Sequence, residues 1–553
     1  MPTPITRRLA AAAAEYPDKA VNFIVSGTVD RVPYPQLHAE ARLVASNLQA
    51  RGVQSGDHVA LLGPTSRRIV TAIQGCWLAG AASMVMPLPM RMGSLDEFIN
   101  QTRGRLIHGD AKALYIDDDF AAFYTEGPDD PPVLPLSSLF AGVDHLVIPP
   151  PDADRLVILQ YTSGSTSEPK GVMIPDRVLG SNLDALAAAA ELVPDDVMVS
   201  WLPLYHDMGL VGILATAMTT ATELVLAAPQ DFLAHPGAWM QWISDFGGSV
   251  TAGPNFAWVL ATRALKRMHD LDLGRMRVML SGAEPVDPDA VEIFVREAAR
   301  FGFRSGAVFP AFGMAEVAIA GTFPEPGRGM VCDVVDRARL ERDRIAAPVG
   351  TDPDDMTSRR LPRLGRCVPG LEMRIVHADT GEALAERRVG ELELRGTSVT
   401  PGYYKRDDAT GALFRDGWLR TGDLGYLVEG ELVLCGRIKD VIIVGGRNIF
   451  PEDIERAIGV VPGVRAGNVI AFGVEGYKGR ESIVVVAETK ADPTDLDALR
   501  HAIHERTTEV AGLPPRDIML VRAGTLPKTS SGKLQRSLCR DRYLNEALEL
   551  VTP

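Results

Sequence analysis

Short apolar runs alternate with longer amphipathic stretches through most of the first 320 residues of the chain. The runs are rich in Val, Leu and Ile and have the length of buried strands, whereas the longer stretches repeat their apolar positions with a helical period. This alternation predicts parallel sheets covered by helices, an α/β fold. Strands are expected at His58–Leu62, Leu156–Gln160, Val197–Trp201, Thr222–Ala227 and Arg277–Leu280, and helices at Tyr34–Arg51, Arg67–Ala79, Asp176–Glu191 and Asp287–Arg300.

The alternation stops between Pro324 and Pro362, a segment rich in Arg, Asp and Pro. Its helical pattern at Asp336–Ile345 stands alone, and we interpret the segment as an insertion or a bridging element. Beyond it, Leu371–Val376 and Val389–Gly396 have the pattern of antiparallel strands. The chain therefore changes from parallel α/β organisation to a β subdomain.

A compact α+β pattern follows Glu431–Val444, a stretch that predicts two strands flanking Gly436–Lys439. At 553 residues the chain exceeds what one hydrophobic core usually serves. From Lys439 onward it holds 16 basic and 16 acidic residues, so all of the net charge of −14 lies before that point. We predict a domain boundary at Arg437–Asp440, with an N-terminal domain at 1–437 and a C-terminal domain at 438–553.

Charge and cysteine content exclude some classes of protein. An acidic chain argues against a broad nucleic-acid binder, which needs a basic face to displace counterions. The five cysteines are scattered without metal spacing, and no signal peptide is recognisable, so reduced thiols in the cytoplasm are expected. The most apolar long stretch, Met208–Pro229, contains four Thr and Glu223, so we expect no transmembrane segment.

The strongest local signal directly follows the strand Leu156–Gln160. Tyr161–Gly171 contains two hydroxyl clusters, a glycine and Lys170. N–H and O–H donors in such a loop can wrap phosphate oxygens, and the lysine adds a point charge. Composition alone would also fit a surface turn, and the spacing is not that of a Walker A loop. The candidate phosphate-binding residues are Thr162, Ser163, Gly164, Ser165, Thr166 and Lys170.

The order of residues in this loop resembles the adenylate-forming superfamily, which includes acyl-CoA synthetases, fatty acyl-AMP ligases, luciferases and peptide-synthetase adenylation domains. Further motifs that resemble this superfamily follow in its order, across nearly the whole chain. The resemblance implies a large N-terminal domain of α/β subdomains plus a β subdomain, and a small mobile α+β C-terminal domain. The motifs are Ser281–Pro285, Phe312–Glu316, Trp418–Leu424, Gly436–Asp440 and Pro527–Lys533.

The resemblance also implies an ATP site. Gly282, Ala283 and Glu284 correspond to the adenine-binding turn, and Phe312, Gly313 and Met314 to the aromatic element that stacks on adenine. Asp423 corresponds to the residue that binds the ribose hydroxyls, Arg437 reaches ribose or phosphate, and Lys439 corresponds to the hinge between the domains.

Adenylation brings a carboxylate against the α-phosphate of ATP, and the two anions repel each other. The site must supply positive charge where negative charge builds up. By resemblance, Lys533 is the catalytic lysine, and Glu316 is a hard oxygen ligand suited to a Mg²⁺ ion that bridges the phosphates. A solvated loop lysine and a helix-start glutamate are the plain structural alternatives.

Two apolar blocks with polar anchors, Trp201–Leu210 and Thr251–Trp258, resemble fatty acyl-AMP ligases and imply a fatty acid substrate. In the first block, His206 matches a position that gates the carboxylate, so it is a candidate catalytic residue. Asp207 follows it, and amino-acid-activating relatives carry an aspartate near this position that pairs with the substrate amine. Core packing alone would give the same apolar content.

The insertion near 324–362 supports the same subgroup, because Asp333–Leu340 and Arg363–Gly370 resemble the insert of fatty acyl-AMP ligases. That insert implies a restrained C-terminal domain and acyl transfer to the phosphopantetheine of an acyl carrier protein. Transfer to CoA by an acyl-CoA ligase remains an alternative, and the basic stretch Arg516–Arg542 suits either acceptor. An amino-acid adenylation module and an inactive nucleotide-binding protein fit the same residues less well.

Overall fold

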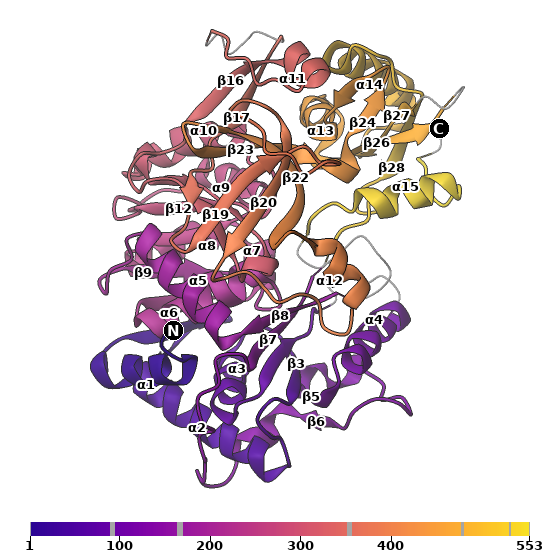
Figure 1. Ribbon diagram of the computed structural model, residues 1–553. Coiled ribbons are helices and arrows are strands. Elements are labelled where there is room, and N and C mark those ends of the chain that lie inside the picture. The colour runs from indigo at the N-terminus through magenta and orange to yellow at the C-terminus, as the bar shows by residue number, and fades with distance from the viewer. Residues whose placement is uncertain are drawn as a thin grey trace. The chain divides into compact units, whose positions relative to one another are not determined.

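The computed structural model describes residues 2–88, 95–162, 170–350, 357–476, 481–529 and 532–551, and they divide into two compact units. Each unit gathers segments that are far apart in the sequence, as the colours of Figure 1 show. The first unit comprises Met1–Val331, Leu364–Glu372 and Leu394–Leu419, and the second comprises Cys332–Arg363, Met373–Glu393 and Arg420–Pro553.

The first unit contains two largely parallel sheets. The seven-stranded sheet is formed by β1 (Ala20–Val25), β2 (Thr28–Pro33), β9 (Val197–Ser200), β10 (Glu223–Leu226), β11 (Val250–Gly253), β12 (Val278–Ser281) and β13 (Val308–Pro310). Its strand order is β13-β12-β11-β9-β10-β1-β2, and β1 and β2 alone of its neighbouring strands pair antiparallel. The parallel pairing predicted from the alternation is confirmed.

The six-stranded sheet has the same character. It is formed by β3 (His58–Leu62), β4 (Ala82–Val85), β5 (Ala111–Ile116), β6 (Val133–Pro135), β7 (Leu156–Tyr161) and β8 (Gly171–Pro175). The strand order is β6-β5-β3-β4-β7-β8, and β7 and β8 are its antiparallel pair.

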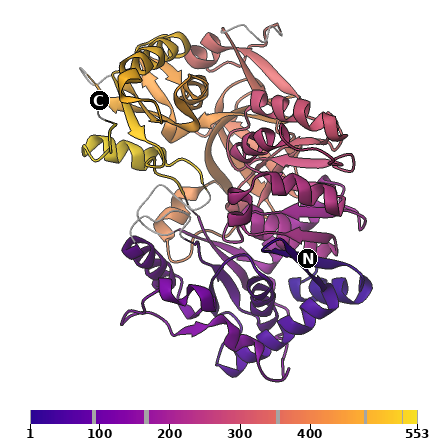
Figure 2. The same ribbon diagram turned by 180° about the vertical axis from the view of Figure 1, so that it is seen from behind.

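Helices accompany both sheets, as the two opposite views of Figures 1 and 2 show. In α3, Ser66 caps the first turn by accepting a hydrogen bond from the N–H of Ile69, and Gly80 ends the helix in the left-handed conformation at φ +82°. The main helices of the unit are α1 (Ile5–Glu15), α2 (Tyr34–Ala50), α3 (Arg67–Ala79), α4 (Leu95–His108), α5 (Asp176–Ala189), α8 (Gly237–Phe246), α9 (Asn255–Leu265) and α10 (Pro288–Ala298).

The second unit begins with the insertion predicted near 324–362. Its helix α11 (Arg337–Asp343) lies inside the predicted helical range, and Asp336 caps it by accepting from the N–H of Arg339 at 2.9 Å. On either side of the helix, β16 (Cys332–Asp336) and β17 (Ser358–Pro362) pair antiparallel. The pattern did not indicate these strands, because buried Arg and Asp side chains interrupt their apolar positions.

The insertion packs into the β subdomain. Val335 and Leu361 share one buried cluster with Tyr426 of β22 (Trp418–Val428), Val433 of β23 (Glu431–Arg437) and Phe450. The other strands of that subdomain are β19 (Leu371–Val376), β20 (Gly390–Gly396) and β21 (Phe414–Arg415).

The remainder of the second unit is the α+β pattern expected at the end of the chain. A three-stranded sheet in the order β26-β27-β28 has a separate apolar cluster on each face. Its elements are η7 (Ile438–Asp440), β24 (Ile442–Val444), β25 (Arg447–Ile449), α13 (Pro451–Gly459), β26 (Val464–Glu475), β27 (Glu481–Thr489), α14 (Leu496–Ala511), β28 (Asp517–Arg522) and α15 (Arg536–Leu544). Because this unit holds the insertion as well as residues 438–553, the boundary at Arg437–Asp440 stays a prediction.

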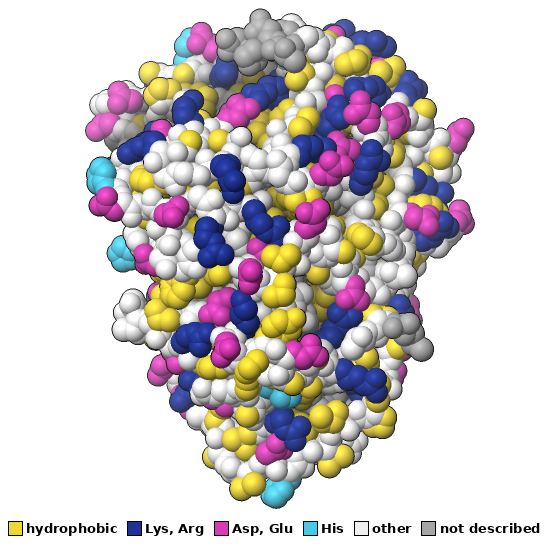
Figure 3. Space-filling model, turned by 90° about the vertical axis from the view of Figure 1, so that its left-hand side faces the viewer, with side chains coloured by type: hydrophobic (Ala, Val, Ile, Leu, Met, Phe, Trp, Pro, Cys, Tyr) yellow, Lys and Arg dark blue, Asp and Glu magenta, His cyan; other side chains and the backbone are white. Residues whose placement is uncertain are grey.

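Among the described residues, none of the helices combines the length and the apolar character that a membrane span requires. On the face shown in Figure 3, acidic and basic side chains are interspersed.

Candidate active site

The C-terminal ends of the parallel strands in the seven-stranded sheet carry many of the residues that the sequence singles out. Strand β9 leads to His206, β12 leads to Gly282–Glu284, and β13 leads to Phe312. Because parallel strands end at the same edge of a sheet, these side chains belong to one region. Ligands of open α/β sheets bind at this edge, beyond the strand ends.

The turn after β12 is tightly constrained. A Cβ atom on Gly282 would lie 3.0 Å from the carbonyl oxygen of Ala311, so any larger residue there would require the neighbouring backbone to shift. Ala283 has φ +67°, a left-handed conformation that costs free energy for a residue with a side chain. Oε1 of Glu284 accepts from the N–H of Phe256 at 2.8 Å and thereby ties the turn to α9.

The predicted aromatic element forms β14 (Phe312–Gly313) and a short turn, η6 (Ala315–Val317). A Cβ atom on Gly313 would lie 2.0 Å from the carbonyl oxygen of Ile319, so no other residue fits without moving the backbone. The N–H of Met314 donates to that same oxygen at 3.0 Å. This turn holds Glu316 in a buried position, 9% exposed.

Glu316 is paired with a tyrosine that the sequence analysis did not single out. The hydroxyl of Tyr403 donates to Oε1 of Glu316 at 2.7 Å, and the N–H of Thr400 donates to the Glu316 carbonyl at 2.8 Å. Burial, together with the nearby carboxylate, holds the pKa of the Tyr403 hydroxyl well above its ordinary value. The ammonium of Lys170 lies 5.4 Å from the centre of the Tyr403 ring. Lys170 and Glu316 therefore meet at one tyrosine.

The predicted phosphate loop begins and ends on paired strands. Tyr161 of β7 pairs with Gly171 of β8, and the N–H of Thr162 donates to the carbonyl of Lys170 at 3.2 Å. The N–H of Tyr404 donates to the Gly171 carbonyl at 2.8 Å, so the Tyr403 segment is fixed beside the end of the loop. The loop residues Ser163, Gly164, Ser165 and Thr166 lie outside the described residues.

His206 follows β9 and contacts the next residue. Its Nδ1 lies 2.6 Å from Oδ1 of Asp207, and the N–H of Met208 donates to that same oxygen at 2.8 Å. A carboxylate this close favours the proton on Nδ1, because the pair is then charge-assisted. The backbone nitrogen of Met208 also lies 3.3 Å from Nδ1 of His206. The contact of Nδ1 with the Asp207 carboxylate is shorter, so we take it as the hydrogen bond of this nitrogen. Asp207 thus orients the imidazole.

The helix that follows His206 is of the π type over Met208–Ala215. Such segments are rare and occur frequently at functional sites. A Cβ atom on Gly209 would lie 2.3 Å from the carbonyl oxygen of Pro203, so the wide helix and the strand-end loop pack backbone against backbone. The apolar pattern of this stretch does not indicate the π form.

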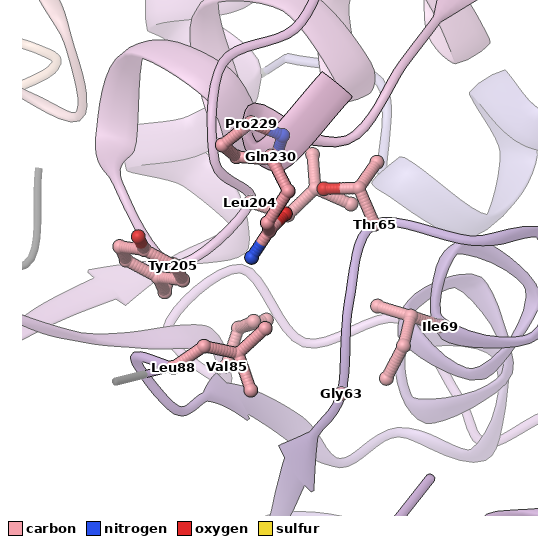
Figure 4. A pocket seen from close by; sticks show the side chains of 9 residues that line it. All are labelled: Gly63, Thr65, Ile69, Val85, Leu88, Leu204, Tyr205, Pro229 and Gln230. Carbon is pink, nitrogen blue, oxygen red and sulfur yellow. The ribbon is translucent and has the colours of Figure 1, made fainter. Parts of the chain in front are cut away.

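A small apolar pocket lies at the strand ends of both sheets in the first unit (Figure 4). Leu204 and Tyr205 come from the loop before His206, and Val85 and Leu88 come from the end of β4. The cavity volume is about 10 Å³, room for roughly one water molecule. The other lining residues are Gly63, Thr65, Ile69, Pro229 and Gln230.

The second unit holds the remaining candidates. Pairing of β22 with β23 sets Asp423 opposite Arg437, whose Nε donates to Oδ1 of the aspartate at 3.0 Å. Burial raises the pKa of Asp423, and the charge of Arg437 opposes that rise. Lys439 lies in η7 and is exposed, and Lys533 lies in the loop before α15.

Comparison with known proteins identifies relatives over nearly the whole chain. The family of AMP-binding enzymes matches residues 9–404. A Mycobacterium tuberculosis protein, described in general terms as a ligase, is 40% identical over 516 residues, 92% of this chain and 94% of the relative. The medium-chain-fatty-acid–[acyl-carrier-protein] ligase JamA of Moorena producens is 32% identical over 564 residues, 96% of this chain and 93% of JamA. A solved structure from work on fatty acyl-adenylate ligases of E. coli and L. pneumophila aligns with a TM-score of 0.91 and 32% identity, covering 99% of this chain and 98% of that chain.

The pairing of Glu316 with Tyr403 predicts the effect of removing a single oxygen. Tyr403→Phe leaves a buried carboxylate with one donor fewer, so the free energy of unfolding should fall by about 1.5–3 kcal/mol. The neighbouring Tyr404→Phe is the matched control, because its hydroxyl donates to the exposed Asp110 at 2.9 Å. Urea denaturation measures both variants, and equal losses would contradict a special role for the buried pair.

Proposed function

The chain belongs to the family of AMP-binding enzymes, and on this basis we propose that it activates a fatty acid with ATP and passes the acyl group to the phosphopantetheine thiol of an acyl carrier protein. It is an enzyme of the fatty acyl-AMP ligase type within the adenylate-forming superfamily. The single observation that carries the proposal is that the loops after β9, β12 and β13, which carry His206, Gly282–Glu284 and Phe312, leave the same edge of one sheet.

In the first half-reaction, a carboxylate oxygen of the fatty acid bonds to the α-phosphorus of ATP. The bond from that phosphorus to the bridging oxygen breaks, and pyrophosphate leaves. Lys533 and Lys170 would supply the positive charge that the two approaching anions require. Gly282–Glu284 and Phe312–Met314 would bind the adenine, and Asp423 and Arg437 would bind the ribose.

Mg²⁺ fits the donors of the first unit. Glu316 offers a hard carboxylate oxygen, and Mg²⁺ in nucleotide sites is held by one or two carboxylates together with phosphate oxygens. When bound, the ion would neutralise charge on the phosphates. Tyr403 would keep the carboxylate oriented through its hydrogen bond at 2.7 Å.

The similarity to JamA, a medium-chain-fatty-acid ligase by its name, supports a fatty acid as the substrate. The apolar pocket of about 10 Å³ is too small to hold a hydrocarbon chain, and its lining alone has suitable chemistry. It opens next to the loop that carries His206, and aliphatic side chains of Ile69, Val85, Leu88 and Leu204 line it. Aliphatic walls beside a polar anchor are what a hydrocarbon chain with a carboxylate head requires. His206, held by Asp207, would stand where the carboxylate meets the phosphate.

In the second half-reaction, a thiol sulfur attacks the carbonyl carbon of the acyl adenylate. A thioester forms, AMP leaves, and the thiol proton passes to solvent. A rotation of residues 438–553 at Lys439 would change the face presented to the adenylate, as a hinge motion. The identity of the thiol then depends on how freely that rotation occurs.

The insertion supplies a physical restraint on that rotation. Arg359 of β17 is 4% exposed; its Nε donates to Asp453 of α13 at 2.9 Å and its Nη2 donates to the carbonyl of Cys435 at 2.9 Å. The guanidinium also lies over the ring of Phe450, 4.4 Å from its centre. Separating this pair would leave the buried Arg359 guanidinium without its carboxylate, and breaking a buried ion pair costs about 3–5 kcal/mol.

Contacts on both sides of the insertion complete the restraint. Oε2 of Glu341, on α11, pairs with Nη2 of Arg447 at 2.6 Å. On the other side, Asp333 of β16 accepts from Arg387 at 3.1 Å and from the hydroxyl of Tyr426 at 2.7 Å. The insertion thus joins the β subdomain to residues 438–553 through buried polar contacts.

A restrained C-terminal part favours the acyl carrier protein as the acceptor. JamA is a carrier-protein ligase by its name, and it is similar along nearly its whole length. The basic stretch Arg516–Arg542 would suit an acidic carrier. We also propose a cytoplasmic location, because all five cysteines are free thiols and three of them are buried.

Lys533→Ala tests the proposed chemistry of the first half-reaction. Without the ammonium, fatty-acid-dependent exchange of pyrophosphate into ATP should fall by about 10²–10³-fold, the usual cost of one charge-stabilising group. Lys528→Ala, a lysine of the same loop, should change the exchange rate less than threefold, roughly 0.6 kcal/mol. Normal exchange by the Lys533 variant would refute the assignment.

Removing both charges of the buried pair tests the restraint. The double variant Arg359→Met/Asp453→Leu removes both charges of the pair and keeps their volume. Arg337, whose Nη1 lies 4.0 Å from Asp453, retains the nearby charge of Glu341, so the fold should persist. With the insertion loosened, the ratio of acyl-CoA to acyl-carrier product should rise by about tenfold or more. A tenfold change in this ratio corresponds to about 1.4 kcal/mol in the difference between the free energies of activation of the two transfers.

The control for this variant is Arg339→Ala, which breaks an exposed pair on the same insertion, Arg339 with Asp343 at 3.4 Å. An unchanged product ratio in the double variant, with intact adenylation, would show that this pair does not select the acceptor.

A further inference from the structure

One arginine near Lys533 has no role in the mechanism above and is the centre of a dense charge cluster. Arg536 begins α15, three residues after Lys533. Its Nη1 lies 2.5 Å from Oδ2 of Asp440, and its Nη2 lies 3.0 Å from Oε2 of Glu455 and 3.3 Å from Oε1 of Glu452. Its Nε donates to Glu455 as well, at 3.2 Å. A single guanidinium therefore faces three carboxylates.

The three carboxylates come from two different elements. Asp440 is the last residue of η7, directly after Lys439, whereas Glu452 and Glu455 lie on α13. The side chain of Arg536 is 17% exposed and that of Asp440 is 12% exposed. Shielded, charge-assisted hydrogen bonds of this kind fix geometry more firmly than surface pairs do. Arg536 thus joins the start of α15 to the hinge segment.

The loop that carries Lys533 is closed directly before Arg536. The N–H of Thr529 donates to the carbonyl of Lys533 at 2.8 Å, and the N–H of Lys533 donates to the hydroxyl of Thr529 at 3.1 Å. The N–H of Gln535 donates to the carbonyl of Pro527 at 2.9 Å. Because the closed loop leads straight into α15, the position of Arg536 sets the position of the lysine backbone.

We propose that Arg536 is a positioning residue for Lys533: it fastens the lysine loop to Asp440 at the hinge and to α13, so that the lysine moves with the hinge as one body. This inference rests on the proposed function, in which Lys533 serves adenylation. A lysine fastened in this way reaches the reacting atoms in one orientation, and small misplacements of a catalytic group are costly.

The cluster holds more carboxylates than arginines, and one of the carboxyl groups, Glu455, has a shifted pKa. Burial raises the pKa of Glu455 to about 7, the charge of Arg536 opposes that rise, and Glu452 adds to it. The groups that face Glu455 are Arg536 and Cys539 of α15, Glu452 of its own helix and the backbone N–H of Ala471, while Asp440 of η7 faces the same guanidinium of Arg536.

The sign of the pH effect follows from that raised pKa. Between the ordinary value of 4.5 and about 7, the folded protein keeps a proton on Glu455 that the unfolded chain has lost. Stability contributed by this group therefore falls as the pH rises through that window. Glu455→Gln should remove this part of the pH dependence.

Kinetics of Arg536→Gln test the proposal. With the loop loosened, kcat for adenylation should fall by about 10–100-fold, while KM for ATP and for the fatty acid changes less than about threefold. Consumption of supplied acyl adenylate by the carrier protein does not use Lys533 and should stay within about threefold of the parent. Arg536→Lys should restore part of the lost rate. Arg540→Gln, at an exposed arginine of the same helix, is the matched control.

A double-mutant cycle separates positioning from general stability. If Arg536 acts through Lys533, adding Arg536→Gln to Lys533→Ala should lower the residual adenylation rate by less than about threefold. An equal loss in both backgrounds, or an unchanged kcat in the single variant, would overturn the proposal. Should Arg536→Gln fail to fold, Asp440→Ala removes the acceptor of the hinge contact alone and should lower kcat in the same direction.

Failure of the proposed function would give a different result. A parent enzyme that forms no adenylate with any fatty acid refutes the function itself. A parent that adenylates normally, alongside an equally active Arg536→Gln variant, refutes only the positioning role.

Discussion

Repulsion between two anions is the constraint on which the arrangement of this enzyme depends. A carboxylate and a triphosphate must approach to bonding distance, and at 4 Å two unit charges repel by about 4 kcal/mol in surroundings of intermediate polarity. The fold places polar and charged groups at the ends of parallel strands. Lys170, Glu316 and Tyr403 meet there, although they come from widely separated parts of the chain. At Gly282 and Gly313 the absence of a side chain lets these turns pack closely against the carbonyl oxygens of Ala311 and Ile319.

A second theme is the use of buried charge to define geometry in the second unit. Arg359 joins the insertion to α13, Glu341 joins it to Arg447, and Arg536 joins the lysine loop to the hinge segment. Buried ion pairs contribute little net stability compared with apolar packing, but breaking one is costly. They would therefore suit the proposed rotation of residues 438–553 between defined positions. The insertion and the arginine cluster would act on the same motion, one by restraining it and the other by transmitting it.

Much of the fold could be predicted from the periodicity of apolar residues. The strand at His58–Leu62 and the helix at Arg67–Ala79 have the predicted bounds, because each is a clean pattern with clear ends. The strands of the insertion could not be predicted, since Arg359 and Asp333 are buried as ion-pair partners where apolar residues are expected. The π-helix at Met208–Ala215 leaves no signature in an entirely apolar sequence.

The residues of the candidate site could be predicted where they belong to a short sequence motif. They could not be predicted where their contacts join residues far apart in the sequence. Gly282–Glu284 and Phe312 follow strands in the sequence and meet at one sheet edge in the structure. Tyr403 lies 87 residues from Glu316, so its hydrogen bond to that carboxylate could be found only in three dimensions. The Arg536 cluster likewise joins residues up to 96 positions apart.

The central claim is that this enzyme makes an acyl adenylate and reserves it for a carrier protein. The most direct measurement forms the adenylate in a single turnover with ATP, Mg²⁺ and a series of fatty acids, then adds CoA or a phosphopantetheinylated carrier protein and follows the products by mass spectrometry. The account predicts an adenylate that persists with CoA and disappears with the carrier as acyl-carrier thioester forms. Rapid conversion to acyl-CoA at a rate equal to or above that with the carrier would contradict it.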